Sequence, residues 1–126
     1  MNSYILLAIA ICLLYLLLPI VCVYMVIRTV VSRKPKKFLK LWARKTARST
    51  DVLFNVIGAD VMNDLFIRSG GYKFGNQKET ISSVIGKNDR INKLTKGGKV
   101  LRFILDRIEK DHCKLSIKED LTNTSK

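Results

Sequence analysis

Three adjacent residues near the C-terminus, Asp111, His112 and Cys113, carry the side chains best suited to chemistry in this sequence. A catalytic Cys–His pair or a zinc site needs such side chains to converge on one atom, and a zinc site needs about four ligands. Neighbouring residues of a helix point about 100° apart, and the chain contains 1 histidine. We therefore predict no catalytic residue, no metal site and no cofactor. Asp111 is expected to cap the start of a helix, with Cys113 as a buried thiol.

Two glycine-containing segments could instead suggest a loop that binds phosphate. The first runs from Gly70 to Gly75, and the second is Gly97-Gly98 followed by Lys99. A phosphate loop follows a buried strand and ends in Lys and then Ser or Thr, and neither segment combines these features. The glycines are therefore expected at helix ends and in loops, and nucleotide binding is not predicted.

The elements that would position these residues begin with a long apolar segment. No charged residue occurs before Arg28, and residues 4–27 are long enough as a helix to cross a hydrocarbon core about 30 Å thick. A cleaved signal peptide is not expected, because no basic residue precedes the segment and no small-x-small cleavage site stands before Arg28 at its end. Residues 1–32 are therefore predicted to be a retained transmembrane anchor. The cations that follow predict an external N-terminus and a cytoplasmic C-terminal part.

A strongly basic stretch follows the anchor, and residues 28–50 contain nine Lys or Arg and no acidic residue. From Pro35 onward, apolar residues such as Phe38 and Trp42 share one helical face and cations another, which is typical of a helix in the headgroup layer. Residues 33–50 are predicted to be this helix, bound to anionic lipids. The predicted membrane contacts are Arg28, Arg33, Lys34, Lys36, Lys37, Lys40, Trp42, Arg44 and Arg48. Alternatively, the charges only set the topology, bind nucleic acid or meet an acidic protein surface.

The remaining chain is predicted to be a small helical domain, residues 51–121, with a flexible tail at residues 122–126. Helices are expected over residues 51–67, 78–85 and 99–110 and after Asp111, with loops at residues 69–78 and 87–98. The apolar rows at helical spacing are Phe54, Ile57, Val61, Met62 and Leu65 in the first helix and Val100, Leu101, Ile104, Leu105 and Ile108 in the third. The fold class is therefore all-α. A core of this size is marginal by itself.

The expected ends of these helices follow from capping residues. Ser49 or Thr50 is expected to cap the first helix, with Asp51 in its first turn. Gly86 is expected to end the second helix, in whose first turn Glu79 would lie.

The order of several polar residues resembles that in a group of short, mostly uncharacterised prophage and mobile-element proteins. The matching residues are Asp51, Asn55 and Gly58, then Glu79-Thr80-Ile81-Ser82, then Asp111-His112-Cys113 and Ser116-Ile117. That group carries an apolar segment, an Asp-Glu-Thr-Ile/Leu-Ser motif and a terminal Asp-His-Cys motif, and here Lys78 stands where the group usually has Asp. The resemblance implies a bacterial or phage origin and no particular activity. The candidates it implies for a shared role are Glu79, Thr80, Ser82, Asp111, His112 and Cys113.

Together these features predict a non-enzymatic, single-pass protein of the bacterial inner membrane. Its cytoplasmic domain would bind another protein, or a second copy of itself, within a membrane assembly, and its basic helix would bind anionic lipids. The alternative is a membrane-tethered module that binds nucleic acid, because the chain carries a net charge of +13 and residues 87–99 are rich in lysine.

Overall fold

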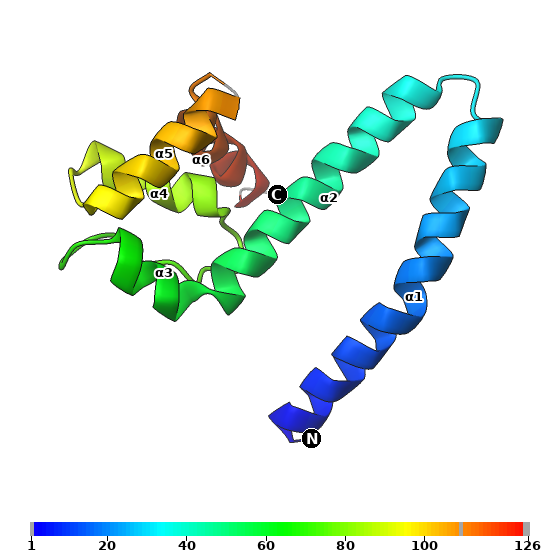
Figure 1. Ribbon diagram of the computed structural model, residues 1–126, viewed down its shortest axis with the longest axis horizontal. Coiled ribbons are helices and arrows are strands. Elements are labelled where there is room, and N and C mark those ends of the chain that lie inside the picture. Colours follow the sequence, from blue (N-terminus) through cyan, green and yellow to red (C-terminus); the bar gives the residue numbers. More distant parts are fainter. Residues whose placement is uncertain (1, 109, 125–126) are drawn as a thin grey trace. The chain divides into compact units, whose positions relative to one another are not determined.

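The computed structural model describes residues 2–108 and 110–124, and the regular secondary structure of these residues is helical (Figure 1). The helices are α1 (Ser3–Val31), α2 (Pro35–Ile57), α3 (Ala59–Phe66), α4 (Ile81–Arg90), α5 (Lys96–Ile108) and α6 (His112–Thr124). Among these residues, one antiparallel β-bridge pairs Ile67, which follows α3, with Leu94, which precedes α5. The prediction of an all-α chain with one long apolar N-terminal helix is confirmed.

The chain divides into two compact units, residues 1–44 and 45–126, and each is described by itself. The first unit contains α1, which has 29 residues and is therefore about 44 Å long. The side chain of Asn2 caps its start by accepting a hydrogen bond from the Tyr4 N–H. α1 is long and apolar enough to cross a membrane. The second unit is called the head below.

The helix α2 begins at Pro35, as expected, but continues without a break to Ile57. The predicted boundary between residues 50 and 51, with a cap at Ser49 or Thr50, is therefore wrong. Serine and threonine cost little in a helix interior, and no glycine or proline stands between Pro35 and Ile57 to end the helix. Asp51 consequently lies well inside α2 and not in a first turn.

The predicted helix over residues 51–67 is interrupted at Gly58, which separates α2 from α3. Gly58 is half-buried, and a Cβ there would lie 3.0 Å from Met62 Cε and 3.1 Å from the Phe54 carbonyl oxygen. A residue without a side chain lets the two helices meet at this close approach. The prediction of helical structure on both sides of Gly58 is correct, but the prediction of one continuous helix is wrong.

The helix α4 starts later and ends later than predicted. Thr80 caps it by accepting a hydrogen bond from the Ser83 N–H at 3.2 Å, so Glu79 precedes the cap and does not lie in the first turn. Gly86 does not end α4 but lies buried inside it, where α6 passes closely. The predicted loop at residues 87–98 is correspondingly shorter, because α4 extends to Arg90 and α5 begins at Lys96.

The helix α6 packs more extensively on α4 than any other helix of the head does (Figure 1). It begins at His112 after Asp111, whose φ of 59° is left-handed. α6 continues to Thr124, so the predicted flexible tail is helical over residues 122–124. Residues 125–126 lie outside the described residues.

The core of the head is small and unusually polar. The buried apolar residues among those described are Phe74, Val84, Ile85, Leu94, Cys113 and Ile117. The buried polar residues are Asn55, Glu79, Thr80, Ser82, Ser83, Asn88, Ser116 and Asp120. With so little apolar burial, hydrogen bonds between helices and loops must fix much of the arrangement.

Most residues of the two predicted apolar rows do not enter this core. Phe54, Ile57, Val61 and Leu65 are exposed, and so are Val100, Ile104 and Ile108. Met62, Leu101 and Leu105 do pack against the core. Helical periodicity identified amphipathic faces correctly, but the expectation that these faces are covered by the chain itself is wrong for most positions.

Candidate functional site

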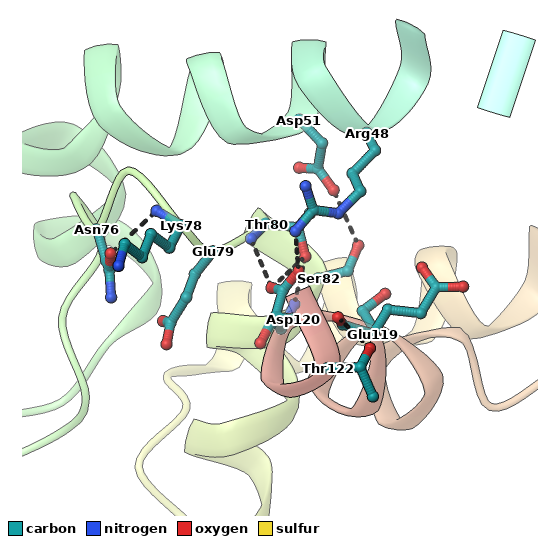
Figure 2. A network of polar contacts seen from close by, with 12 residues as sticks. Arg48, Asp51, Asn76, Lys78, Glu79, Thr80, Ser82, Glu119, Asp120 and Thr122 are labelled. Carbon is teal, nitrogen blue, oxygen red and sulfur yellow. Dashed lines mark hydrogen bonds and ion pairs between the residues drawn. The ribbon is translucent and has the colours of Figure 1, made fainter. Parts of the chain in front are cut away.

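Two carboxylates from different helices meet at the N-terminus of α4 (Figure 2). Asp120 of α6 accepts hydrogen bonds from the N–H of Thr80 at 2.9 Å and from its hydroxyl at 3.2 Å. Arg48 of α2 donates to the other oxygen of Asp120 at 2.8 Å, and this ion pair is buried on the aspartate side. The arrangement connects α2, α4 and α6 through one carboxylate. It also places negative charge at the positive end of α4.

Asp51 is the second carboxylate of this cluster. It accepts a hydrogen bond from the Ile81 N–H at 3.0 Å and one from the Ser82 hydroxyl at 3.5 Å. Burial raises the pKa of Asp51, although the Ile81 N–H and the charge of His112 act in the opposite direction. Asp51 therefore binds a proton more readily than an exposed aspartate does.

Three asparagines hold the segment that enters this cluster, residues 68–80. Asn55 donates to the carbonyl oxygens of Asn76 at 3.0 Å and Glu79 at 2.7 Å and accepts from the Gly75 N–H at 3.0 Å. Asn88 accepts from the Tyr72 N–H at 2.8 Å and donates to the Tyr72 carbonyl oxygen at 2.7 Å. Asn63 accepts from the Phe74 N–H at 2.8 Å. A loop without regular structure is thereby fixed by side chains from α2, α3 and α4.

Glu79 belongs to a second polar group beside the first. One of its carboxylate oxygens accepts a hydrogen bond from the Tyr72 hydroxyl at 3.0 Å and pairs with the Lys87 ammonium group. The same ammonium group lies 4.4 Å from the centre of the Tyr72 ring. Burial alone would lower the pKa of Lys87 and is the largest single effect, but the bond and charge of Glu79, together with Tyr72, raise it overall. Lys87 therefore stays protonated and acts as an ion-pair partner.

The structure assigns a different cap to α6 from the one predicted. The Cys113 N–H donates to a carboxylate oxygen of Asp106 at 3.2 Å, whereas the Asp111 carboxylate pairs with Lys114 at 3.2 Å on the surface. The Asp111 carbonyl oxygen, not its side chain, accepts the first backbone bonds of the helix. The prediction of Asp111 as a side-chain cap is therefore wrong. Its left-handed backbone directs the carboxylate elsewhere, and Asp106 reaches the helix start from α5.

This correction predicts a difference between the two aspartates. Asp106→Ala should lower the free energy of unfolding of the head by about 1–2 kcal/mol, because it removes the cap of α6. Asp111→Gly should not lower it, because the Lys114 pair is exposed and glycine adopts a left-handed backbone without strain. Thermal melting followed by circular dichroism measures both. A loss for Asp111→Gly as large as that for Asp106→Ala would restore the original assignment.

The predicted burial of the Cys113 thiol is confirmed, since the residue is 2% exposed. Burial raises the pKa of Cys113 to about 12, and the negative charge of Asp106 acts in the same direction. The thiol is therefore protonated at neutral pH, whereas a nucleophile or a zinc ligand must be a thiolate. Among the described residues, no three His, Cys, Asp or Glu side chains gather in a way that could hold a metal ion.

The structure brings some of the candidate residues together and separates others. Thr80 and Ser82 lie in the cluster at the start of α4, where Asp51 interacts electrostatically with His112. Glu79 faces Tyr72 and Lys87, and Asp111 lies on the surface. The two sequence motifs therefore meet where α4 packs on α6, but not all their side chains converge on one point.

The structure contradicts one of the nine predicted membrane contacts. The Arg48 guanidinium is bonded to the buried Asp120 and does not point to a lipid surface. The other eight lie between residues 28 and 44, and all of them are exposed. Their contact with lipid stays a prediction.

Several residues of these clusters could not be singled out from the sequence. Asp120 is one of several charged residues of the predicted last helix, and Asn88 lies in a segment predicted to be a loop, yet both are buried. Tyr72 and Lys87 fell in segments expected to be loops. Only Asn55 gave a signal, as a polar residue between apolar ones and as part of the resemblance. Their common function is to hold α2, α4, α6 and the loop in one arrangement.

No family model, curated protein or solved structure matches this chain. The resemblance to prophage and mobile-element proteins stays a prediction based on the motif residues alone.

Proposed function

We propose that this chain is a non-enzymatic, single-pass protein of the bacterial inner membrane whose head binds a partner protein. The anchoring is supported by α1, which is long and apolar enough to span a membrane, and by the cations that follow it. The polar clusters described above support the non-enzymatic part, because most of their polar side chains form bonds that join helices to one another or to the loop. The proposed binding surface is the partner row, which consists of Phe54, Ile57, Val61 and Leu65.

The partner row is the observation that carries the proposal. Its four side chains are between 57% and 71% exposed and follow a helical spacing of 3, 4 and 4 residues across the join of α2 and α3. Two exposed apolar side chains on each of two successive helices fit an interface in which apolar anchors enter a groove of another protein. Apolar patches that a small domain leaves exposed commonly mark interaction sites.

The charges beside the partner row indicate what kind of partner fits. Asp60 and Asp64 are exposed on α3 next to Val61 and Leu65. These carboxylates would be repelled by an anionic bilayer but would pair with lysine or arginine beside an apolar face of another protein. A bound partner would also stabilise a head whose own core is small, through mass action.

The test is affinity purification of the full chain from bacterial membranes in mild detergent. A protein, or a second copy of the chain, should co-purify with the wild type and be lost from the Val61→Gln/Leu65→Gln variant. Leu121→Gln is the matched control, because Leu121 is 62% exposed on α6 and lies outside the row. Recovery of the monomer alone, or equal recovery of the partner with the row variant, would contradict the proposal.

The proposed topology makes a separate prediction. A reporter enzyme that is active only outside the cytoplasm should show no activity when it is fused after Lys126. The same reporter joined before Met1 through a short linker should be active, because the cations after α1 retain the C-terminal side in the cytoplasm. Activity of the C-terminal fusion would reverse the orientation.

The alternative of nucleic-acid binding has less support. It relied on a basic loop at residues 87–99, but Lys87 belongs to α4 and pairs with Glu79, and Lys93 donates to the Ser69 carbonyl oxygen at 3.1 Å. Retention of the protein on a nucleic-acid column with a steep dependence on salt would favour this alternative. No retention at low salt would eliminate it.

A further inference from the structure

The helix α5 presents a second exposed apolar face, distinct from the partner row. Val100, Phe103, Ile104 and Ile108 are between 50% and 79% exposed, while Gly98, Leu101 and Leu105 on the opposite side face the core. Four large apolar side chains exposed on one helix of a small domain form an apolar patch, and such patches commonly bind another surface.

The charges on α5 differ in sign from those beside the partner row. Lys96, Lys99 and Arg107 are exposed on this helix, and Lys110 follows it. The Arg107 guanidinium lies 5.8 Å from the centre of the Phe103 ring, at the edge of the apolar face. The Asp106 carboxylate, in contrast, pairs with the Arg102 guanidinium at 3.3 Å and accepts a hydrogen bond from the Cys113 N–H. The exposed part of α5 is therefore apolar and basic.

We propose that α5 binds the surface of an anionic phospholipid bilayer, with its apolar side chains among the acyl-chain ends and its cations on the headgroups. Basic amphipathic helices with large apolar residues bind such surfaces in this way. Charge complementarity favours the anionic bilayer over a second copy of α5, because the cations of two α5 helices would repel each other. The inference rests on the membrane anchoring in the proposed function, because a tethered head meets the bilayer at a high effective concentration.

The test uses tryptophan fluorescence of the full chain in nanodiscs. Trp42→Phe removes the 1 native tryptophan, and Phe103→Trp then places a probe on the α5 face. Lipids with brominated acyl chains should quench this probe in discs that contain phosphatidylglycerol and should leave it unquenched in discs of phosphatidylcholine alone. The matched control carries Phe54→Trp in the same background, on the partner row, and should not be quenched in either disc.

The electrostatic part is tested by two variants with equal loss of charge. Lys99→Gln/Arg107→Gln should reduce the ratio of docked to undocked head by about 30-fold, at roughly 1 kcal/mol per cation. Lys73→Gln/Lys118→Gln, which changes exposed residues outside α5, should leave the quenching of the Phe103→Trp probe unchanged.

The outcomes separate this inference from the function on which it rests. A chain that incorporates into the discs but shows no quenching in anionic lipid would overturn the docking and leave the anchoring intact. Failure to incorporate would overturn both. Equal quenching of the two probes would also overturn the docking, because it would show a non-specific approach of the whole head. A spectral shift that depends on the number of chains per disc, without quenching, would instead identify a second copy as the occupant.

Discussion

Replacing Gly86 with alanine should lower the free energy of unfolding of the head by about 3 kcal/mol. The new Cβ would lie 2.7 Å from the Cys113 carbonyl oxygen and 3.0 Å from Ile117 Cδ1. The nearer atom belongs to the backbone of α6, so a change of rotamer cannot relieve the contact and the two helices must move apart. For a domain of this size, such a loss lowers the melting temperature by at least about 12 °C.

Gly97→Ala is the matched control for this substitution. Gly97 lies in the first turn of α5, and the nearest atom to its added Cβ would be 3.4 Å away, at an ordinary contact distance. Alanine forms helices better than glycine, so this variant should melt at the same temperature as the wild type or at a higher one. The comparison uses circular dichroism of the full chain in detergent. Equal effects of the two substitutions would show that α4 and α6 do not meet at Gly86.

Replacing Asn55 with alanine should also lower the free energy of unfolding of the head by about 3 kcal/mol. The side chain is fully buried and makes three hydrogen bonds, to Gly75, Asn76 and Glu79. Its removal leaves three backbone groups of residues 75–79 without their partner, and each buried group without a partner costs roughly 1–3 kcal/mol. We expect the summed cost to lie near the lower end of that range, because the released loop can move and let its backbone groups bond to water.

The release of the loop gives this prediction a second readout. Lys73 and Lys78 are exposed within it and are sites for trypsin. Asn55→Ala should therefore speed tryptic cleavage at both lysines as well as lowering the melting temperature. Asn63→Ala, which loses one hydrogen bond to Phe74, should cost about 1 kcal/mol and change cleavage less. A protease-resistant Asn55→Ala variant would show that other contacts hold the loop.

The helical class and the apolar N-terminal helix could be predicted because they depend on local pattern. Charge-free length identifies α1, and periodic apolar residues identify the helices of the head. Helix ends were less predictable, because a glycine can either end a helix or lie inside one where a neighbouring backbone passes closely. The sequence alone does not distinguish these two roles. Gly86 and Gly98 were expected at ends or in loops, but both lie in helices at positions where a neighbouring backbone leaves no space for a Cβ.

The polar clusters were least predictable, because their partners are distant in the sequence. Asp111 and Asp106 are both plausible caps for α6, and only the packing of α5 on α6 selects Asp106. Arg48 and Asp120 are 72 residues apart, and Arg48 was predicted to contact lipid, while Asp120 looked like a solvated charge in its own segment. The exposed rows on α2–α3 and on α5 have a similar explanation, because periodicity defines an apolar face but cannot say which surface covers it.

The three asparagines also determine how fast individual amides of the loop exchange their protons with water. The N–H groups of Tyr72, Phe74 and Gly75 are each held by a side chain of a different helix, through Asn88, Asn63 and Asn55. In a segment without regular structure, such protons would ordinarily exchange fast. Here each should exchange only when its own asparagine withdraws. The three amides therefore report the separate opening of α4, α3 and α2, and a protein that binds the partner row should slow the exchange of Phe74 and Gly75 more than that of Tyr72.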